Sequence, residues 1–195
     1  MPEGTQVGES SNPRLTLVTG NDGKRREVQA CLAGHVLVEN AKLDLPEIQS
    51  SSVAEISRNK ALAAYELLKR PVLVEDTALC FEALGGLPGP YVKWFLEKMA
   101  PVGLGKLLQG FDTRRAYALC VFTYCAGPDA VLQFEGRCDG TIVEAPRGEG
   151  GFGWDSIFEP DEGRGQTYAE MLEAMKNQIS HRARALVALK AHFCH

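Results

Sequence analysis

The chain has 195 residues, 45% of them hydrophobic, and a formal net charge of -4 at pH 7. This acidic balance argues against a protein that binds nucleic acid or an anionic membrane, because such binding depends on clustered positive charge. No apolar run reaches the roughly eighteen residues of a membrane span, no signal-peptide pattern opens the chain, and the six cysteines are scattered, so we expect a cytoplasmic enzyme with reduced thiols.

The start of the chain predicts a tail followed by a strand, a helix and a second strand. We expect residues 1–13 to form a flexible tail and residues 14–195 to form a single domain. The segment RLTLVTG predicts a strand that ends at Gly20, and HVLVEN predicts the next strand. Between them, KRREVQACLAG predicts a short helix closed by Gly34.

A second helix and a buried strand follow. Ser52 and Glu55 have the spacing of a capping box and predict a helix that runs to about Leu68. The apolar spacing of this helix turns Ile56 and Leu67 toward the core. A proline then ends the helix, and the apolar run VLV predicts a strand that is buried on both faces. This alternation predicts an α/β fold with a sheet that is at least partly parallel.

Two acids, Glu75 and Asp76, directly follow the buried run. An unpaired carboxylate is costly inside a sheet, so we expect both acids where the strand stops. Alternation puts Asp76 on the same face as Val74, and open α/β sheets bind ligands at the carboxyl ends of their strands, so Asp76 is the better placed of the two for a cleft. A capping or turn acid is the alternative interpretation.

The second half of the chain predicts helices and then mostly strands. GGLPGPYVKWFLEKM predicts a Gly/Pro loop and a helix with Pro90 in its first turn, and GLGKLLQG predicts a further short helix. The segments AYALCVFTYC, AVLQFEGRCDG and TIVEAP are β-rich with turn-length gaps, which predicts an antiparallel meander. A glycine-rich loop, RGEGGFGWDSIF, comes next, and the last predicted helix runs from about Asn177 to Phe193.

The turn after the first strand, TGNDGK, is a candidate phosphate site. A short Gly/Asn turn before a helix can aim several backbone N–H groups at one anion, and Thr19, Asn21 and Lys24 add side-chain donors. The turn is not a Walker A loop, because Val18 and Arg25 stand where that motif has glycine and Ser or Thr. An ordinary strand-to-helix turn is the alternative.

Glu47, in the segment LDLPEIQ, and Asp76 are candidate ligands of Mg²⁺. This ion is typically held by one or two carboxylates, while substrate oxygens and waters complete its octahedron. Two carboxylates about 4 Å apart repel by roughly 4 kcal/mol at an effective dielectric near 20, and a divalent cation relieves that repulsion. Glu75 would support the pair. A glutamate that follows a proline in a loop can also be simply solvated.

Two segments near the carboxyl terminus have the composition of a base-binding site. In GGFGWD, Phe152 can stack on a base, Trp154 can pack inward and Asp155 can accept a hydrogen bond from a base or ribose. The same residues would equally well anchor a loop. In KNQISHRAR, cations gather at a predicted helix start, where they oppose the helix dipole. An anionic or electron-rich ligand would justify them, and a solvated basic face is the alternative.

Taken together, these segments resemble the inosine triphosphate pyrophosphatase family, and in particular its eukaryotic branch. TGNDGK, DLPE, VEDTALCF, GGLPGPYVKWFLEK, FGWD, TYAEM and KNQISHR occur in the family's order, from Leu15 almost to the end of the chain. The resemblance implies an α/β fold with an elongated mixed sheet flanked by helices, two lobes around a central cleft, and a homodimer. Two departures are Gly23 in the first turn and Leu172 where relatives usually have proline.

Site residues follow from the same resemblance where the motifs match. It implies Mg²⁺, with Mn²⁺ as a substitute, held by Glu47 and Asp76, and catalysis by Asp76, Glu47, Glu75 and Lys24. The implied contacts of the nucleotide are the turn Thr19, Gly20, Asn21, Asp22, Gly23 and Lys24, then Lys60, Asp76, Thr77 and Lys93, and for the base and ribose Phe152, Gly153, Trp154, Asp155, Lys176, Ser180, His181 and Arg182.

The family's activity predicts hydrolysis of inosine, deoxyinosine and xanthosine triphosphates to the monophosphate and pyrophosphate, which cleanses the nucleotide pool. Mg²⁺ and the lysines would stabilise the charge that develops as water attacks the α-phosphorus, and Asp76 or Glu75 would orient that water. Donors aimed at the 6-oxygen of the base from Arg182, His181 or the backbone would be left unpaired by ATP, at about 1–3 kcal/mol each. Two alternatives stay open: a Maf-type nucleotide pyrophosphatase of other specificity, and a nucleotide-binding module without turnover.

Overall fold

The computed structural model describes residues 14–193, so the predicted tail over residues 1–13 lies outside the described residues. Besides two short 3-10 turns, the elements in chain order are β1 (Arg14–Val18), α1 (Asp22–Leu32), β2 (Leu37–Ala41), α2 (Val53–Leu68), β3 (Val72–Phe81), β4 (Pro88–Gly89), α3 (Val92–Lys106), β5 (Arg115–Gly127), β6 (Ala130–Ile142), β7 (Phe158–Pro160), α4 (Glu173–Ile179) and α5 (His181–Phe193).

The strands of residues 14–193 form one mixed sheet in the order β2-β1-β3-β5-β6-β7, with β4 paired to β3. β1 is parallel to β2 and β3, whereas the pairs from β3 to β7 are antiparallel. The predicted α/β class and partly parallel sheet are therefore confirmed. The meander differs in one respect: of the segment TIVEAP, only Thr141 and Ile142 belong to a strand, where they end β6.

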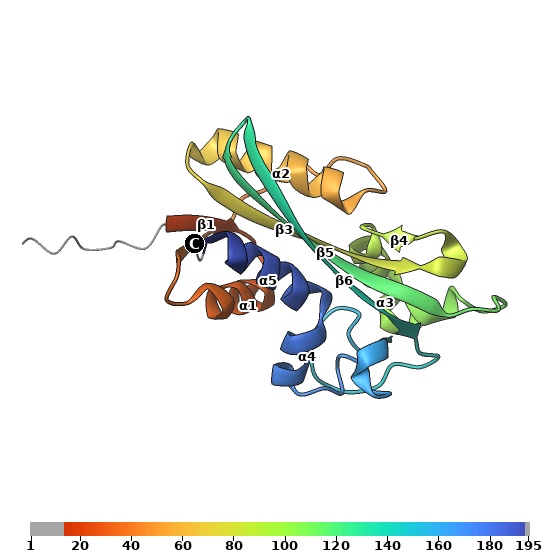
Figure 1. Cartoon of the computed structure of the whole chain (residues 1–195). Helices are drawn as coiled ribbons and strands as arrows, with labels where there is room; N and C mark the ends of the chain where they lie inside the picture. Colours follow the sequence, from red (N-terminus) through yellow and green to blue (C-terminus); the bar gives the residue numbers. More distant parts are fainter. Residues whose placement is uncertain (1–13, 194–195) are drawn as a thin grey trace, which may run out of the picture.

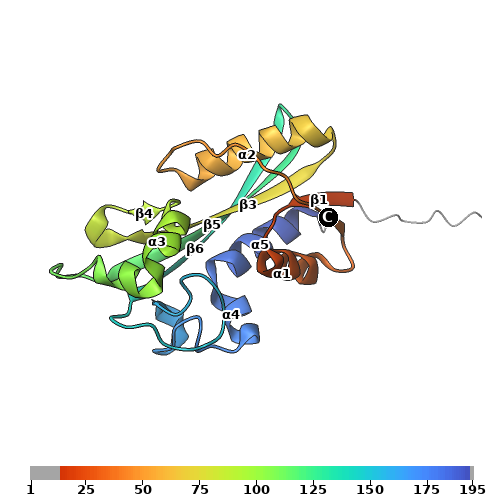
Figure 2. The same cartoon turned by 180° about the vertical axis from the view of Figure 1, so that it is seen from behind.

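Helices cover both faces of this sheet. Figure 1 shows α2 on one side of the long strands and α1 and α5 on the other, and Figure 2 shows the same layers from behind. α2 packs on β3 and β5, while α5 packs on β5 and β6. None of the helices among the described residues is both long and apolar enough to cross a membrane.

Separate hydrophobic clusters divide the molecule into two lobes. One cluster, with Leu17, Leu73 and Phe122, lies between the sheet and helices α1 and α5. Another, with Phe81 and Phe158, lies at the far end of the sheet under α3 and β7. Strands β3, β5 and β6 run through both lobes, which fixes the lobes relative to each other (Figure 2).

Strand β3 is longer than the sequence predicted. It runs through to Phe81, so Glu75 and Asp76 lie in its middle and not where the strand stops. The cause is its partner strand, because β5 pairs with every residue of β3, whereas β1 pairs only with the first two and ends at Val18. The two acids therefore lie just beyond the end of β1, where β3 loses its parallel neighbour.

The cap of helix α2 is where the sequence placed it. The Ser52 hydroxyl accepts a hydrogen bond from the backbone N–H of Glu55 at 3.2 Å. The reciprocal half of a capping box differs, because the Glu55 carboxylate accepts from the Ser50 hydroxyl instead. Ile56 is buried as expected, but Leu67 is 63% exposed and does not face the core. Small residues on this helix, among them Ala64, contact the sheet in its place.

Two further helices begin and end at other residues than expected. Helix α3 begins at Val92, so Pro90 precedes its first turn, and the short helix predicted after it is its second half, beyond a kink at Ala100. The last predicted helix is in fact two, α4 and α5, separated at Ser180, whose backbone is extended.

Four cysteines (Cys80, Cys120, Cys125 and Cys138) are buried free thiols, as predicted, and Cys194 lies outside the described residues.

Candidate active site

A cavity of about 690 Å³ lies where the two lobes meet, and residues of both lobes line it. Its lining includes all of the predicted site residues except four. The predicted residues that line it are Thr19, Gly20, Asn21, Lys24, Glu47, Lys60, Glu75, Asp76, Thr77, Lys93, Phe152, Gly153, Trp154, Asp155, His181 and Arg182. Sequence reasoning missed further lining residues, namely Val18, Leu43, Asp44, Leu45, Pro90, Val92, Trp94, Leu96 and Glu97.

The four exceptions, Asp22, Gly23, Lys176 and Ser180, do not line this cavity. Asp22 is the exposed first residue of α1. A Cβ added at Gly23 would come within 3.3 Å of the Phe152 ring, so this glycine lets the first turn of α1 approach the aromatic loop. The Ser180 hydroxyl accepts the N–H of Ala183 at 3.1 Å and so caps α5. Its role in the structure is therefore local.

The turn between β1 and α1 is built by short hydrogen bonds. Asn21 is the N-cap of α1: its side-chain oxygen accepts from the backbone N–H of Lys24, and its own N–H donates to the Thr19 hydroxyl, each at 3.1 Å. The Lys24 ammonium group reaches β3, where it lies 2.5 Å from Glu75 Oε2. The phosphate candidate predicted from TGNDGK thus has a helix N-terminus and a lysine on one wall of the cavity.

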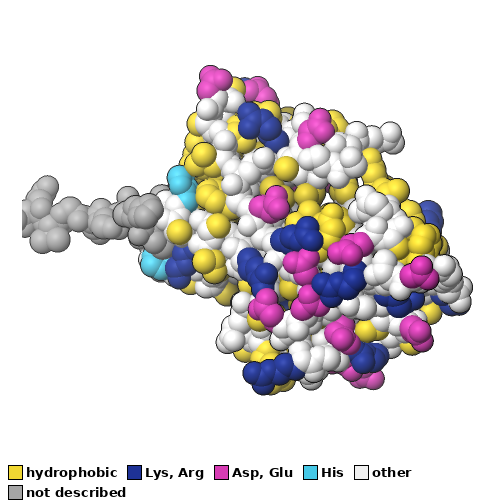
Figure 3. Space-filling model, turned by 45° about the vertical axis from the view of Figure 1, so that its right-hand side comes forward, with side chains coloured by type: hydrophobic (Ala, Val, Ile, Leu, Met, Phe, Trp, Pro, Cys, Tyr) yellow, Lys and Arg dark blue, Asp and Glu magenta, His cyan; other side chains and the backbone are white. Residues whose placement is uncertain are grey.

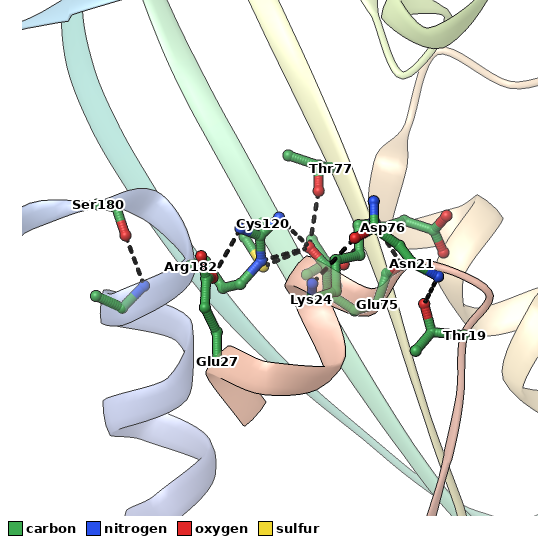
Figure 4. A network of polar contacts seen from close by, with 12 residues as sticks. Thr19, Asn21, Lys24, Glu27, Glu75, Asp76, Thr77, Cys120, Ser180 and Arg182 are labelled. Carbon is green, nitrogen blue, oxygen red and sulfur yellow. Dashed lines mark hydrogen bonds and ion pairs between the residues drawn. The ribbon is translucent and has the colours of Figure 1, made fainter. Parts of the chain in front are cut away.

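Glu75 is the centre of a buried polar network (Figure 4). Its Oε1 accepts hydrogen bonds from the Thr77 hydroxyl at 2.7 Å, the Cys120 thiol at 3.2 Å and the Arg182 guanidinium at 3.2 and 3.3 Å. Burial alone would raise the pKa of Glu75, but the charges of Arg182 and Lys24 outweigh it and hold that pKa far below its usual range. The carboxylate is therefore ionised, with Oε1 held by hydrogen bonds, whereas Oε2 makes no hydrogen bond with the described residues and is held by the ion pair with Lys24 alone.

Arg182 is buried at the start of α5, with 3% of its surface exposed. Its Nη1 donates to Glu27 Oε2 at 2.9 Å, in addition to its bonds to Glu75. An arginine carries five N–H groups, so these three contacts leave two for a ligand. Glu27 is a residue that the sequence reasoning missed, although its position three residues after Lys24 puts both on the same side of α1.

On the opposite face of β3, Asp76 and Glu47 both bind Lys60 of α2. The Lys60 Nζ lies 2.6 Å from Asp76 Oδ1 and 2.9 Å from Glu47 Oε1. The second oxygen of Asp76, Oδ2, is buried without a hydrogen-bond partner in the described structure. Burial raises the pKa of Asp76, whereas in Glu47 the hydrogen bond and charge of Lys60 outweigh burial and lower the pKa.

This arrangement fits a magnesium ion held by two carboxylates. Within residues 14–193, His, Cys, Asp and Glu side chains do not gather in threes around a point that could hold a metal. Mg²⁺ does not require such a group, because substrate oxygens and waters supply most of its ligands. Oxygens of Glu47 and Asp76 converge on one point, the Lys60 nitrogen, and Asp76 has a free buried oxygen. The donor set and its convergence therefore suit a hard divalent cation.

The opposite end of the cavity is aromatic. His181 is 2% exposed, and neither of its ring nitrogens has a hydrogen-bond partner among the described residues. Burial, and after it the charge of Arg182, lower the pKa of His181 well below its usual value, so the imidazole is neutral at pH 7. Its ring contacts both Trp154, with centroids 5.3 Å apart, and Tyr168, at 5.9 Å, and these two rings also contact each other at 6.1 Å.

The glycine-rich loop holds Phe152 at the cavity by a buried ion pair. Asp155 Oδ2 accepts the backbone N–H of Phe152 at 2.8 Å and the Lys176 ammonium at 2.6 Å. A Cβ added at Gly151, which has φ 72, would collide with the Asp155 carboxylate. Trp154 packs inward as one interpretation predicted, while Phe152 is 39% exposed and remains available to a planar ligand.

On the face in Figure 3, basic and acidic side chains alternate. As far as the described residues form it, this face therefore carries no single-sign patch, and the cavity has its own positive charge from Lys24, Lys60 and Lys93 in the lining. The fold and this cavity together define a two-lobed α/β protein whose cleft has lysines and carboxylates at one end and aromatic rings at the other. The chain belongs to the Ham1 family, whose model matches residues 15–192. The family resemblance read from the sequence motifs is therefore confirmed.

Relatives of known name are similar over nearly the whole chain. "Inosine triphosphate pyrophosphatase 2" of Trypanosoma cruzi (strain CL Brener) is 80% identical over 195 residues, which are all of both chains. "Inosine triphosphate pyrophosphatase" of Phaeosphaeria nodorum is 52% identical over 178 residues, or 90% of this chain and 92% of that one. The solved structure of a HAM1 protein from Coxiella burnetii matches with a TM-score of 0.83 at 27% identity, over 93% of this chain and 98% of that chain.

Proposed function

We propose that this protein hydrolyses inosine, deoxyinosine and xanthosine triphosphates to the monophosphate and pyrophosphate, and so cleanses the cytoplasmic nucleotide pool. One observation carries the proposal: a single cavity joins lysines and carboxylates at one end to Phe152 and the unpartnered His181 at the other. A nucleoside triphosphate has the same two-ended chemistry. The names of the similar proteins support inosine triphosphate as a substrate.

At the phosphate end, Lys24 and Lys93 face the negative charge of the triphosphate. Glu47 and Asp76 would hold Mg²⁺, or Mn²⁺ in its place, and the bound ion would neutralise charge on the phosphate oxygens. We assign the orientation of the attacking water to Asp76, because its Oδ2 is not engaged. Glu75 cannot take this role while Oε1 is bonded to Arg182 and Oε2 is ion-paired with Lys24, so we assign to it the positioning of those two cations.

At the base end, Phe152 stacks on the purine, and Arg182 discriminates between bases by the group at their 6-position. A guanidinium has donors only, so an N–H of Arg182 turned to the base pairs with the 6-oxygen of hypoxanthine or xanthine and not with the 6-amino group of adenine. Sites built on such pairing reject the wrong ligand by roughly 10⁴–10⁵. Neutral His181 can donate or accept according to its tautomer, so it contributes affinity more than selection.

A substrate panel tests this function. The purified protein is incubated with Mg²⁺ and ITP, dITP, XTP, GTP, ATP or dUTP, and pyrophosphate and orthophosphate are measured separately. We expect pyrophosphate as the first product, from the first three nucleotides. Orthophosphate as the first product would mean cleavage at the γ-phosphate, and turnover of dUTP alone would favour a pyrophosphatase of other specificity. Binding without turnover in every case would make the protein a nucleotide-binding module.

The family resemblance also supports a homodimer. Exposed apolar side chains such as Trp94 and Val102 on α3 are available for a contact between subunits. Light scattering coupled to size-exclusion chromatography measures the mass in solution. We expect twice the mass of one 21.2 kDa chain, and a mass equal to one chain at micromolar concentration would contradict the dimer.

A further inference from the structure

The ammonium group of Lys60 occupies the point on which one oxygen of Glu47 and one oxygen of Asp76 converge. It bridges Asp76 and Glu47, the two carboxylates that we assign to Mg²⁺, with N–O distances of 2.6 and 2.9 Å. The side chain of Lys60 is only 16% exposed, and the Asp76 side chain is 14% exposed, so this contact is partly shielded from solvent. Solvent therefore screens the Lys60–Asp76 ion pair less than a surface pair, whereas the Glu47 side chain is 47% exposed and its pair with Lys60 is screened more.

The ammonium and a divalent ion cannot both keep these oxygens. Mg²⁺ binds oxygen ligands at about 2.0–2.1 Å and holds them in a near-ideal octahedron. An ion at that distance from Asp76 Oδ1 and Glu47 Oε1 would lie close to the Lys60 nitrogen, and two positive charges at such range repel each other. Lys60 must therefore turn away before an ion binds these two oxygens, and an ion that used the free Asp76 Oδ2 would still meet the repulsion of the nearby ammonium group.

A phosphate group in the cavity could bind the Lys60 ammonium in place of the two carboxylates. Lys60 lines the same cavity as the β1–α1 turn and Lys93, which together form its phosphate end. A lysine has a flexible four-carbon stem, so its ammonium can exchange a carboxylate for a nearby phosphate oxygen without movement of α2. The triphosphate would thus supply the partner that frees Glu47 and Asp76.

We propose that Lys60 competes with the divalent cation for Glu47 and Asp76, and that the triphosphate ends this competition by accepting the ammonium group. The cation and the nucleotide then bind cooperatively, because each removes the obstacle to the other, and such coupling is reciprocal. The inference rests on the proposed function, since it requires a triphosphate in this cavity. It makes Lys60 a positioning residue that sets the order of binding.

Binding of Mn²⁺ to the full chain, without nucleotide, tests the competition directly. Titration calorimetry or the electron paramagnetic resonance signal of free Mn²⁺ gives the dissociation constant. We expect Lys60→Met to bind Mn²⁺ at least about tenfold more tightly than the unaltered protein, which corresponds to 1.4 kcal/mol. Equal or weaker binding by Lys60→Met would overturn the proposal. Lys60→Gln, which keeps hydrogen-bond donors without the charge, provides a second variant should Lys60→Met fold poorly.

Lys93→Met is the matched control. Lys93 lines the same cavity, but its ammonium lies over the Trp94 ring, 5.1 Å from the centroid. Its removal takes the same charge out of the cleft without freeing a carboxylate from Lys60. The charge of Lys93 helps to lower the pKa of Glu47, so we expect a gain in Mn²⁺ affinity for this variant that is clearly smaller than the gain in Lys60→Met. An equal gain in Lys93→Met and Lys60→Met would mean a general charge effect and would overturn the competition.

Two further arms separate the inference from the proposed function. A non-hydrolysable α,β-imido analogue of ITP should tighten Mn²⁺ binding more in the unaltered protein than in Lys60→Met, and an equal effect would overturn the role of the triphosphate. Asp76→Asn should weaken Mn²⁺ binding, and unchanged affinity would put the ion elsewhere and overturn the inference. Tighter Mn²⁺ binding by Lys60→Met, together with no pyrophosphate release from any nucleotide by the unaltered protein, would uphold the competition and refute the proposed function.

Discussion

Replacement of Glu75 by glutamine should destabilise the protein strongly, because Lys24 and Arg182 would then face a neutral amide inside the fold. The two ion pairs of Glu75 are buried, with 1% of its side chain exposed. Removal of one partner of a buried pair typically costs about 3–5 kcal/mol, since the remaining charge is left without compensation. Glu27 still holds one side of Arg182, which places the expected loss near the lower limit of this range.

Thermal unfolding measures this loss. In a chain of this size, 1 kcal/mol changes the melting temperature by about 2–4 °C, so Glu75→Gln should melt about 6–12 °C below the unaltered protein. Differential scanning calorimetry or circular dichroism gives the two temperatures. Glu66→Gln is the control, because Glu66 pairs with Lys69 at the surface, where both side chains are more than 60% exposed. Such a pair contributes about 0–1 kcal/mol.

The difference in stability between Glu75→Gln and the unaltered protein should depend on pH. The folded pKa of Glu75 lies far below its usual value, so the unfolded chain binds the proton more readily. The contribution of Glu75 to stability is therefore complete above about pH 4.3 and falls by about 1.4 kcal/mol per pH unit below it. The gap in melting temperature between Glu75→Gln and the unaltered protein should narrow below that pH. A Glu75→Gln variant that melts within 2 °C (about 1 kcal/mol) of the unaltered protein at pH 7 would refute this account of the network.

Three other substitutions probe the chemistry. Asp76→Asn should abolish pyrophosphate release while the circular dichroism spectrum stays unchanged, and full activity would remove Asp76 from the mechanism. Phe152→Ala should raise KM for ITP by about 5- to 150-fold, the equivalent of 1–3 kcal/mol of stacking, with Phe152→Tyr as the control that keeps the ring. Glu27→Gln should loosen Arg182 and narrow the preference for ITP over ATP in kcat/KM; unchanged selectivity would mean that Glu75 alone positions the guanidinium.

The sequence by itself determined the local structure and the class of the protein. Apolar periodicity and caps predicted most helices and strands, because these signals act within a few residues: the Ser52 side chain caps α2 three positions on, as predicted. The Asn21 side chain caps α1 in the same way, although the sequence analysis named it only as a phosphate donor. The motifs also named most residues of the cavity. One local signal was overlooked, since Ser180 is a good N-cap and marks the break between α4 and α5.

The tertiary structure alone decided how the charges are paired. Isolated acids in the middle of a buried strand looked too costly, so the sequence predicted that β3 stops at Glu75. The strand continues because β5 pairs along its whole length and because Lys24 and Arg182, 51 and 107 positions away in the chain, compensate the carboxylate. Cys120, 45 positions away, joins them only through the strand register. Periodicity reports which face of an element is buried, whereas an ion pair depends on which elements the fold brings together.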